Sequence, residues 1–291
     1  MARAPRRPRQ ETGSAGNDVV AALLDRFAGR GHGRRLLDRL AKPGAAPSQI
    51  AREVARSAAF ARLYKEARTV EIAAAGPKQA DPAYVGLPAI DPAMPFEVLF
   101  RDVFRRRLAR RAEGFAALFE ALAAHSQPLI IETGSLRIPG NWEGDGQSTF
   151  QFDAYVRRTG GQFFSIDILP ESIDTARRAC SAATNLICND SVAALYALSR
   201  LLPGPAAMVY LDSYDLDLKD PMPSAIHHAL ELAAVRPLLG PGTLVCIDDY
   251  GVGPPSGSTE VGGKGLIVDR FFAAIGAPVL YSGYQRLWRV P

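Results

Sequence analysis

The chain has 291 residues, with 34 lysines and arginines against 30 aspartates and glutamates, and a formal net charge of +4. Hydrophobic residues make up 47% of it and charged residues 22%, which is typical of soluble globular proteins and outside the range of disordered ones. No run approaches the roughly eighteen apolar residues of a membrane span, and the first twenty residues lack the apolar block of a secretory signal. We therefore expect a cytoplasmic protein with more than one structural unit.

Three cysteines are present, Cys180, Cys188 and Cys246. Their odd number and their place inside apolar or helical runs argue against a disulfide framework and a zinc cluster, so we expect small core residues. Four arginines among the first nine residues match the whole net charge. We expect residues 1–16 to be a disordered, solvated basic tail. No basic surface interleaved with aromatic residues accompanies it, so nucleic-acid binding is not expected.

Residues 17–75 have the pattern of a small helical module. Between Asp18 and about Lys65, apolar residues recur at spacings of three and four, and glycine and proline clusters divide the pattern into short helices. This region either completes a substrate pocket or makes a contact between two copies of the chain, and no motif in it favours one of the two.

Residues 76–125 are expected to form a connector and a long helix. Five prolines between positions 77 and 95 forbid a continuous helix there. From Phe96 to Ala124 the pattern is that of one amphipathic helix or a pair, with an arginine-rich face that we expect to be solvated. The arginines of this face are Arg101, Arg105, Arg106, Arg107, Arg110 and Arg111.

From Pro128 onward, short apolar runs alternate with helical stretches, which is the pattern of a parallel sheet covered by helices. The predicted strands are 128–133, 162–167, 185–189, 206–212 and 242–248, and the predicted helices lie near 149–158, 172–183, 191–202, 223–238 and 264–275. The last residues, 279–281 and 287–290 around a turn at 282–284, predict an antiparallel strand pair. The expected fold class is α/β. Its mostly parallel, Rossmann-like sheet has seven strands with a C-terminal antiparallel hairpin, spans residues 126–291 and follows a small helical N-terminal region.

The first predicted strand ends in a glycine-rich turn. In open α/β sheets, ligands bind beyond the carboxyl ends of the strands. Here the strand runs into Glu132, Gly134 and Ser135 and later reaches Gly140. Glycines allow the backbone to approach a ligand closely, and a carboxylate suits the ammonium group of an amino acid. The same turn, taken alone, is equally typical of a tight connection.

Two further strand ends are polar. Asp167 ends the second strand, where a carboxylate can accept both hydroxyls of a ribose. Asp190 and Ser191 follow the third strand, where an acid and a hydroxyl can meet an adenine edge. Asp190 equally suits the N-cap of the next helix. In this order, the three strand ends favour the binding of a nucleoside.

Four motifs together resemble the class I S-adenosylmethionine-dependent methyltransferases over residues 126–291. They are Ile131-Glu132-Thr133-Gly134, Ser165-Ile166-Asp167, Tyr210-Leu211-Asp212-Ser213 and Cys246-Ile247-Asp248-Asp249-Tyr250. The resemblance is greatest to the metal-dependent O-methyltransferases of the catechol and macrocin types. It implies a methyltransferase sheet, S-adenosyl-L-methionine as cofactor, and O-methylation of a small polyhydroxylated acceptor such as a sugar or natural product. The stretch 140–149 is longer and more acidic than the glycine turn of that family.

Asp212, Asp248 and Asp249 lie at the ends of the fourth and fifth strands. The resemblance implies that these carboxylates bind Mg²⁺ or another divalent cation, which suits an all-oxygen site. The cation would bind two neighbouring oxygens of the acceptor and lower the pKa of one hydroxyl. The alternative is that Asp248 or Asp249 only caps the following loop.

The proton acceptor is expected on the helix after the fourth strand or in the loop before it. His227 and His228 are adjacent on that helix, so at most one points into the site, and a lone histidine on a helix is more often a packing or surface residue. Asp215 and Asp217 are alternatives in the loop, or are solvated turn residues. The glycine-rich stretch 251–265 has a composition that does not pack, and is either a mobile lid or a surface connection.

Three alternative functions come from other classes of protein: a hydroxylase-like enzyme, a binding module and an oxidoreductase. One is an enzyme of related fold that resembles the cephalosporin hydroxylases, and another is a nucleoside-binding module without catalysis. A nicotinamide-dependent oxidoreductase would need a Gly-x-Gly-x-x-Gly turn, which residues 134–140 do not provide.

Overall fold

The computed structural model describes residues 87–251 and 263–291, the strand Ala73–Ala74 and the single positions 35 and 38. The chain divides into two compact units, residues 1–65 and 66–291, and the second contains the sheet. The predicted tail 1–16, most of the predicted helical module 17–75 and residues 252–262 of the predicted lid lie outside the described residues. No helix in the described ranges is long and apolar enough to cross a membrane.

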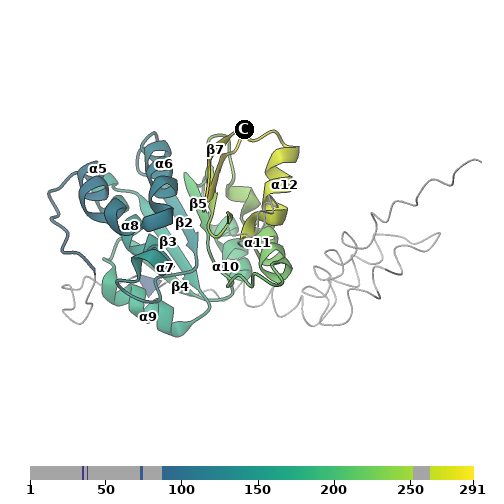
Figure 1. The fold of residues 1–291 in the computed structure, drawn as a ribbon, viewed down its shortest axis with the longest axis horizontal. Helices are drawn as coiled ribbons and strands as arrows, with labels where there is room; N and C mark the ends of the chain where they lie inside the picture. The colour runs from purple at the N-terminus through teal and green to yellow at the C-terminus, as the bar shows by residue number, and fades with distance from the viewer. Residues whose placement is uncertain (1–34, 36–37, 39–72, 75–86, 252–262) are drawn as a thin grey trace, which may run out of the picture. The chain divides into compact units, whose positions relative to one another are not determined.

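The second unit is built on an eight-stranded sheet of order β1-β4-β3-β2-β5-β6-β8-β7 (Figure 1). Its strands are β1 (Ala73–Ala74), β2 (Leu129–Thr133), β3 (Gln162–Asp167), β4 (Thr184–Cys188), β5 (Met208–Leu211), β6 (Leu244–Ile247), β7 (Val279–Ser282) and β8 (Arg286–Arg289). The five strands β2 to β6 are parallel to one another, whereas β8 pairs antiparallel with both β6 and β7. The predicted Rossmann-like sheet of seven strands with a C-terminal antiparallel hairpin is confirmed.

The eighth strand, β1, pairs antiparallel with β4 at the edge of the sheet. The sequence does not predict it, because a two-residue strand leaves no periodicity.

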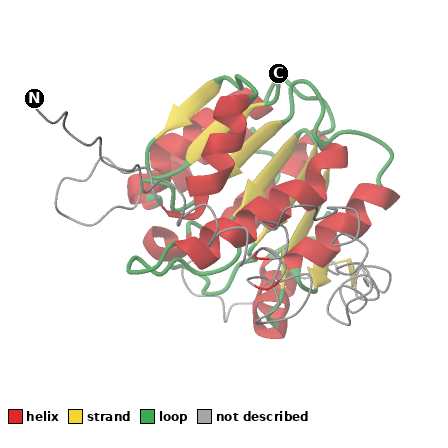
Figure 2. Ribbon diagram, turned by 90° about the vertical axis from the view of Figure 1, so that its right-hand side faces the viewer, coloured by secondary structure: helices red, strands yellow, loops and turns green. Residues whose placement is uncertain are grey.

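Helices cover both faces of the sheet (Figures 1 and 2). They are α5 (Phe96–Leu99), α6 (Ala112–Leu122), α7 (Trp142–Asp145), α8 (Ser148–Thr159), α9 (Pro170–Ala179), α10 (Ser191–Leu201), α11 (Met222–Val235) and α12 (Leu266–Ala274). Local signals set their starts: Pro170 occupies the first turn of α9, and Asp190 accepts a hydrogen bond from the Ala193 N–H at 3.1 Å to cap α10. All five predicted helices between and after the strands are present.

The core on one face is aromatic. The ring of Tyr210 in β5 lies 5.7 Å from that of Phe115 in α6 and 5.4 Å from that of Phe152 in α8. Alternate strand residues face the other way, where α10, α11 and α12 pack. Burial on both faces explains why these strands are continuous apolar runs rather than alternating ones.

The region predicted as one amphipathic helix or a pair forms two, α5 and α6, with a break between them. A π-helical turn, η1 (Phe100–Phe104), and two 3₁₀ turns, η2 (Arg105–Arg107) and η3 (Ala109–Arg111), separate α5 from α6. Ala109 has a φ of 44°, outside the helical region, so the chain changes direction there. Because of this break, Arg111 points inward and is 3% exposed, so its prediction as part of a solvated face is wrong.

Two other expectations about packing need correction. Cys180 and Cys246 are buried core residues as predicted, but Cys188, the last residue of β4, is exposed. At the end of the predicted lid, η5 (Gly263–Gly265) is buried rather than loose. An added Cβ on Gly263 would collide with the carbonyl oxygen of Asp249, and one on Gly265 would meet the Tyr250 ring, so glycine is what allows this turn to pack.

Candidate active site at the carboxyl edge of the sheet

The turn after β2 lies against the end of β5. Gly134 has a φ of +85°, and a Cβ at this position would collide with the carbonyl oxygen of Asp212. Its N–H donates to the carbonyl oxygen of Ile166 at 2.8 Å, which ties the turn to β3 as well. Only glycine combines this positive φ with the absence of a Cβ, so Gly134 allows the turn to approach the ends of the neighbouring strands closely.

Asp167 is held in place by backbone donors. Its Oδ2 accepts from the Ser135 N–H at 2.9 Å and its Oδ1 from the Leu169 N–H at 2.8 Å. Burial raises the pKa of Asp167, and the two N–H donors act against that shift. A carboxylate oxygen has a further lone pair, so each oxygen can still accept a hydroxyl from a ligand. The structure thus brings Gly134, Ser135 and Asp167 together, as the sequence predicts.

Glu132 is a buried carboxyl near the end of β2. Its side chain is fully buried, and its Oε2 accepts from the hydroxyls of Thr149 at 2.7 Å and Ser165 at 2.6 Å. Burial raises the pKa of Glu132 to about 7. These hydrogen bonds tie β2 to α8 and β3, and the contact of Glu132 with an ammonium group stays a prediction.

The long stretch after Gly134 is closed by its own hydrogen bonds. The Gly140 N–H donates to Oε1 of Gln147 at 3.0 Å, and Nε2 of Gln147 donates to the Ile138 carbonyl at 3.0 Å. Asn141 caps the short helix α7 by accepting from the Gly144 N–H at 3.2 Å. Gly140 therefore helps to shape this loop.

Asp190 and Ser191 follow β4 at the start of α10. Asp190 is the N-cap of α10, which matches the second of the two roles that its position suits. The hydroxyl of Ser191 lies 2.9 Å from Nε2 of His227 in α11, and Ser191 is buried. Ser191 is therefore directed toward α11, and its contact with an adenine stays a prediction.

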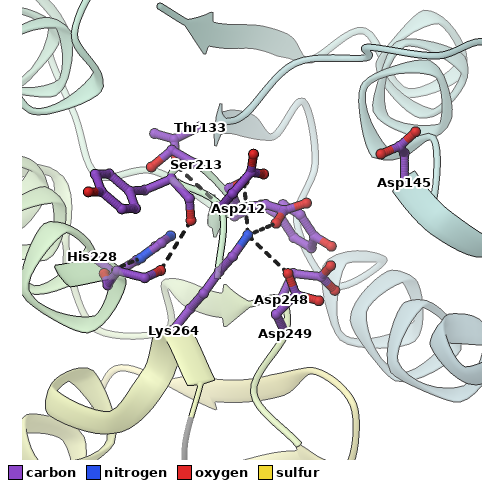
Figure 3. Close-up of polar contacts among 12 residues, drawn as sticks. Thr133, Asp145, Asp212, Ser213, His228, Asp248, Asp249 and Lys264 are labelled. Atoms are coloured by element: carbon purple, nitrogen blue, oxygen red, sulfur yellow. Dashed lines mark hydrogen bonds and ion pairs between the residues drawn. The ribbon is translucent and has the colours of Figure 1, made fainter. Parts of the chain in front are cut away.

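The three carboxylates predicted to bind a metal meet at one point. Asp212 follows β5, Asp248 and Asp249 follow β6, and one oxygen from each lies within 4.8 Å of the others (Figure 3). Asp249 has a φ of 49°, which turns its side chain back toward Asp212. The parallel register of β5 and β6 brings these strand ends side by side.

Two cations already contact this cluster. The ammonium of Lys264 lies 2.5 Å from Oδ1 of Asp212 and 3.1 Å from Oδ2 of Asp249, and its side chain is 3% exposed (Figure 3). The guanidinium of Arg111 donates to Oδ2 of Asp248 through Nε at 2.9 Å and Nη2 at 2.8 Å, and Asp248 is fully buried. Lys264 comes from η5 and Arg111 from η3, far from each other in the sequence.

Tyr284, between β7 and β8, completes the cluster. Its hydroxyl donates to Oδ1 of Asp249, and its ring lies under the guanidinium of Arg111 at 4.6 Å. Arg111 also donates to the Glu143 carbonyl at 2.7 Å, which links the acidic cluster to the loop of α7. One connected network therefore joins the predicted cofactor loop and the carboxylates.

The charges of this network support one another. Although burial opposes ionisation, Asp212 and Asp249 raise the pKa of Lys264, so the ammonium stays charged. Burial opposes the charge of Arg111 too, but Asp248 raises the pKa of that guanidinium further. Burial raises the pKa of Asp212, as do Asp248 and Asp249, and Lys264 acts against this shift. A cluster of three carboxylates is stable here because two cations lie inside it.

This arrangement does not fit a divalent cation. The donor set of three carboxylates suits Mg²⁺, but Lys264 and Arg111 hold oxygens of all three side chains. A metal would have to displace the ammonium from between Asp212 and Asp249. The three predicted metal ligands therefore lie together, but each already has an oxygen paired with Lys264 or Arg111.

The two histidines of α11 are buried rather than aimed at the acidic cluster. Nδ1 of His228 donates to the Ser224 carbonyl at 2.7 Å, and burial lowers the pKa of His228 to about 4. Nε2 of His227 lies 3.3 Å from Glu231, which also accepts from the Ser213 hydroxyl at 2.6 Å. Neither histidine contacts a carboxylate of the cluster among the described residues. Their expected role as proton acceptors has no support in this geometry.

The loop acids suggested as alternatives are exposed. Asp215 pairs with Arg137 at 2.9 Å, and Asp217 accepts from the Lys219 N–H at 2.8 Å. These are the contacts of solvated turn residues.

No protein-family model matches this chain, and no curated protein matches it. Among solved structures, the MycE methyltransferase from the mycinamycin biosynthetic pathway, in complex with Mg, SAH and mycinamycin VI, is 17% identical with a TM-score of 0.45. The match covers 62% of this chain and 49% of that one, so this chain spans about half the length of MycE. An O-methyltransferase from Bacillus cereus in complex with SAH is 15% identical, with 71% and 94% of the two chains covered and a TM-score of 0.41.

A third similar structure is a single-residue mutant of the 16S rRNA (adenine(1408)-N(1))-methyltransferase from Catenulisporales acidiphilia. It is 14% identical over 76% of this chain and 95% of that one, with a TM-score of 0.37. At such identities and TM-scores, the function of this chain has to be argued from its own residues.

The residues that sequence reasoning missed are the partners of the acids. Lys264 stands between glycines in a stretch expected to be loose, and Arg111 stands in a run of arginines. Glu231 lies on a helix one turn after His227, a spacing that does signal a contact. For Lys264 and Arg111, no local signal distinguishes a buried cation from a solvated one.

Proposed function

We propose that this protein is an S-adenosylmethionine-dependent methyltransferase that acts on a hydroxyl oxygen of a small, polyhydroxylated acceptor. The observation that carries the proposal is the turn at Gly134, whose backbone approaches the end of β5 beside Asp212 while Ser135 holds Asp167. A cofactor at this edge would lie against the turn, within reach of both aspartates.

The surroundings of Asp167 support a nucleoside. Ile168 is 65% exposed and Leu169 48% exposed, directly after the carboxylate. Exposed aliphatic side chains beside a fixed carboxylate suit a ligand with a flat apolar base and a hydroxylated sugar. We assign the ribose of the cofactor to Asp167 and one face of its adenine to these two side chains.

Asp212 is the residue that we assign to the acceptor. It lies against the Gly134 turn, is 18% exposed at its side chain, and has one oxygen occupied by Lys264. The other oxygen can accept a hydrogen bond from an acceptor hydroxyl and take its proton. S-adenosylmethionine, when bound, supplies a methyl group activated by the sulfonium. The protein orients the attacking oxygen and excludes water.

Calorimetric titration tests the cofactor. We expect the protein to bind S-adenosylmethionine and S-adenosylhomocysteine but not NAD⁺, and Asp167→Ala to weaken binding about tenfold or more, because a ribose hydroxyl loses a charged acceptor. Binding of NAD⁺ alone would contradict the proposal. So would equal affinity in Asp167→Ala and the wild type.

A second arm tests the chemistry with labelled cofactor and a panel of hydroxylated acceptors. Asp212→Asn is expected to lose methyl transfer while keeping cofactor affinity within about threefold, because Asp212 faces the acceptor. Cofactor binding with no transfer to any acceptor would favour the non-catalytic binding module.

A further inference from the structure

The acidic cluster of this site contains its own counter-ions. Three carboxylates, Asp212, Asp248 and Asp249, carry three negative charges when ionised, and Lys264 and Arg111 supply two positive ones. The two positive charges of Lys264 and Arg111 equal the charge of one divalent cation. The cations come from chain segments that pack tightly, so their presence at the cluster is built into the fold.

Lys264 is fixed by the backbone on which it stands. The glycines on both sides of it pack directly against Asp249 and Tyr250, with no room for a Cβ. The Lys264 N–H is itself 3.4 Å from the Asp249 carbonyl. The ammonium therefore reaches its place through a buried turn and not through a free surface side chain.

The hydrogen bonds of Lys264 leave no donor for a substrate. An ammonium has three N–H donors. Two lie toward Oδ1 of Asp212 at 2.5 Å and Oδ2 of Asp249 at 3.1 Å, and the third lies toward the Asp212 carbonyl at 3.3 Å. Lys264 therefore acts by positioning the carboxylate of Asp212.

Arg111 closes the other end of the cluster. It holds both oxygens of Asp248 through Nε, at 2.9 Å and 3.3 Å, and its Nη1 holds the Glu143 carbonyl at 2.7 Å. Removing Asp248 from this pair would leave the buried guanidinium with only Asp249, at 3.6 Å, as a counter-charge, which is unfavourable. Asp248 is therefore not free to turn toward a metal.

We propose that Lys264, with Arg111, takes the place of a divalent cation in this site, so that Asp212 is positioned by an ammonium and the protein works without a bound metal. The inference rests on the proposed function as far as the methyl transfer is concerned. The pairing of the three carboxylates with Lys264 and Arg111 does not depend on that function. It also separates this site from the metal-dependent enzymes that its motifs resemble.

Titration with Mn²⁺, followed by electron paramagnetic resonance, tests the proposal on the full chain at neutral pH. The wild type is expected to hold no bound Mn²⁺ up to about 1 mM. Lys264→Met removes the charge and keeps a side chain of similar length, so it is expected to bind Mn²⁺ at least about tenfold more tightly than the wild type. Lys219→Met, at an exposed position in the loop after β5, is the matched control and should behave as the wild type.

Two results would overturn the proposal. One is wild-type binding of Mn²⁺ with a Kd below about 1 mM that Asp212→Asn removes. The other is a folded Lys264→Met variant, shown by circular dichroism, that gains no Mn²⁺ binding. If Lys264→Met does not fold, Lys264→Gln replaces it, and the wild-type titration decides on its own.

Methyl transfer gives a separate readout. With an active acceptor, the rate is expected to be unchanged by EDTA and by added Mg²⁺. A loss of rate in EDTA that Mg²⁺ restores would contradict the proposal. If no acceptor is methylated, the proposed function fails, but the Mn²⁺ titration still tests the role of Lys264.

Discussion

At the scale of single residues, burial decides what the charged side chains do. Arg111 belongs to a run of six arginines within eleven positions, yet it alone of them is buried, at 3% exposure. A buried guanidinium is tolerable only with a well-placed partner, and Asp248 provides one through two short hydrogen bonds. Glu132 shows the same principle for an acid, because its hydroxyl partners offset only part of the cost of burial.

Glu132 makes stability depend on pH. Its pKa is raised by burial from 4.5 to about 7. Between these values the folded state keeps the proton and the unfolded state releases it, so stability falls as pH rises through this window. The loss is up to about 3 kcal/mol in the free energy of unfolding.

Glu132→Gln removes this titration. We expect the stability of the variant relative to the wild type to increase by about 3 kcal/mol between pH 4.5 and 8, measured by urea unfolding at both values. Glu120→Gln, at an exposed position on α6, is the control and should follow the wild type. Parallel curves for all three proteins would show that Glu132 does not take up a proton on folding.

At the scale of elements, the turns after the strands set the geometry of the site. Gly134 and Gly263 both have positive φ and both lie against the backbone of a neighbouring site residue, Asp212 and Asp249. The two turns thus place the aspartates and, through η5, the ammonium of Lys264. A side chain at either glycine would push apart the strand ends that the site needs close together.

Gly134→Ala tests this close approach. The matched control is Gly242→Ala, since Gly242 has a φ of +90° with nothing within 4 Å of an added Cβ. Both variants carry the backbone strain of about 1 kcal/mol, but only Gly134→Ala adds a collision. We expect it to lose at least about 1 kcal/mol more stability than the control, by urea unfolding, and to weaken cofactor binding. Equal losses would mean that the turn has room to move.

At the scale of the whole molecule, residues 66–291 form one of the two compact units and contain every residue assigned to the site. Its core runs without a break from α6 and α8 through the sheet to β8. We therefore expect this unit to unfold in one cooperative transition. The contacts of the acidic cluster described above are all made between residues of this unit.

A chain of residues 66–291 is therefore expected to fold alone. At a cofactor concentration about 100-fold above Kd, S-adenosylmethionine should stabilise it by about 2.7 kcal/mol, or roughly 5–10 °C in Tm. Differential scanning calorimetry of this chain and of the full chain measures both effects. A fragment that shows no cooperative transition would contradict the assignment of the fold to residues 66–291.

Much of this architecture is predictable from the sequence. The strands from β2 onward are predicted within two residues of each end, because buried parallel strands are short apolar runs that differ locally from the helices between them. Once the strands are parallel, their carboxyl ends must lie at one edge. This is why Gly134, Asp167 and the three aspartates of the acidic cluster can be grouped from their places along the chain.

Only the tertiary structure decided which cations pair with the carboxylates of the site. Arg111 and Asp248 are 137 positions apart, and Lys264 and Asp212 are 52 apart, so no local pattern relates them. Whether a charged side chain is solvated or buried depends on the turn beneath it and on what packs above it. Sequence by itself determined where the acids gather. The packing of η3 and η5 decided that two internal cations, and not open ligand positions, meet them there.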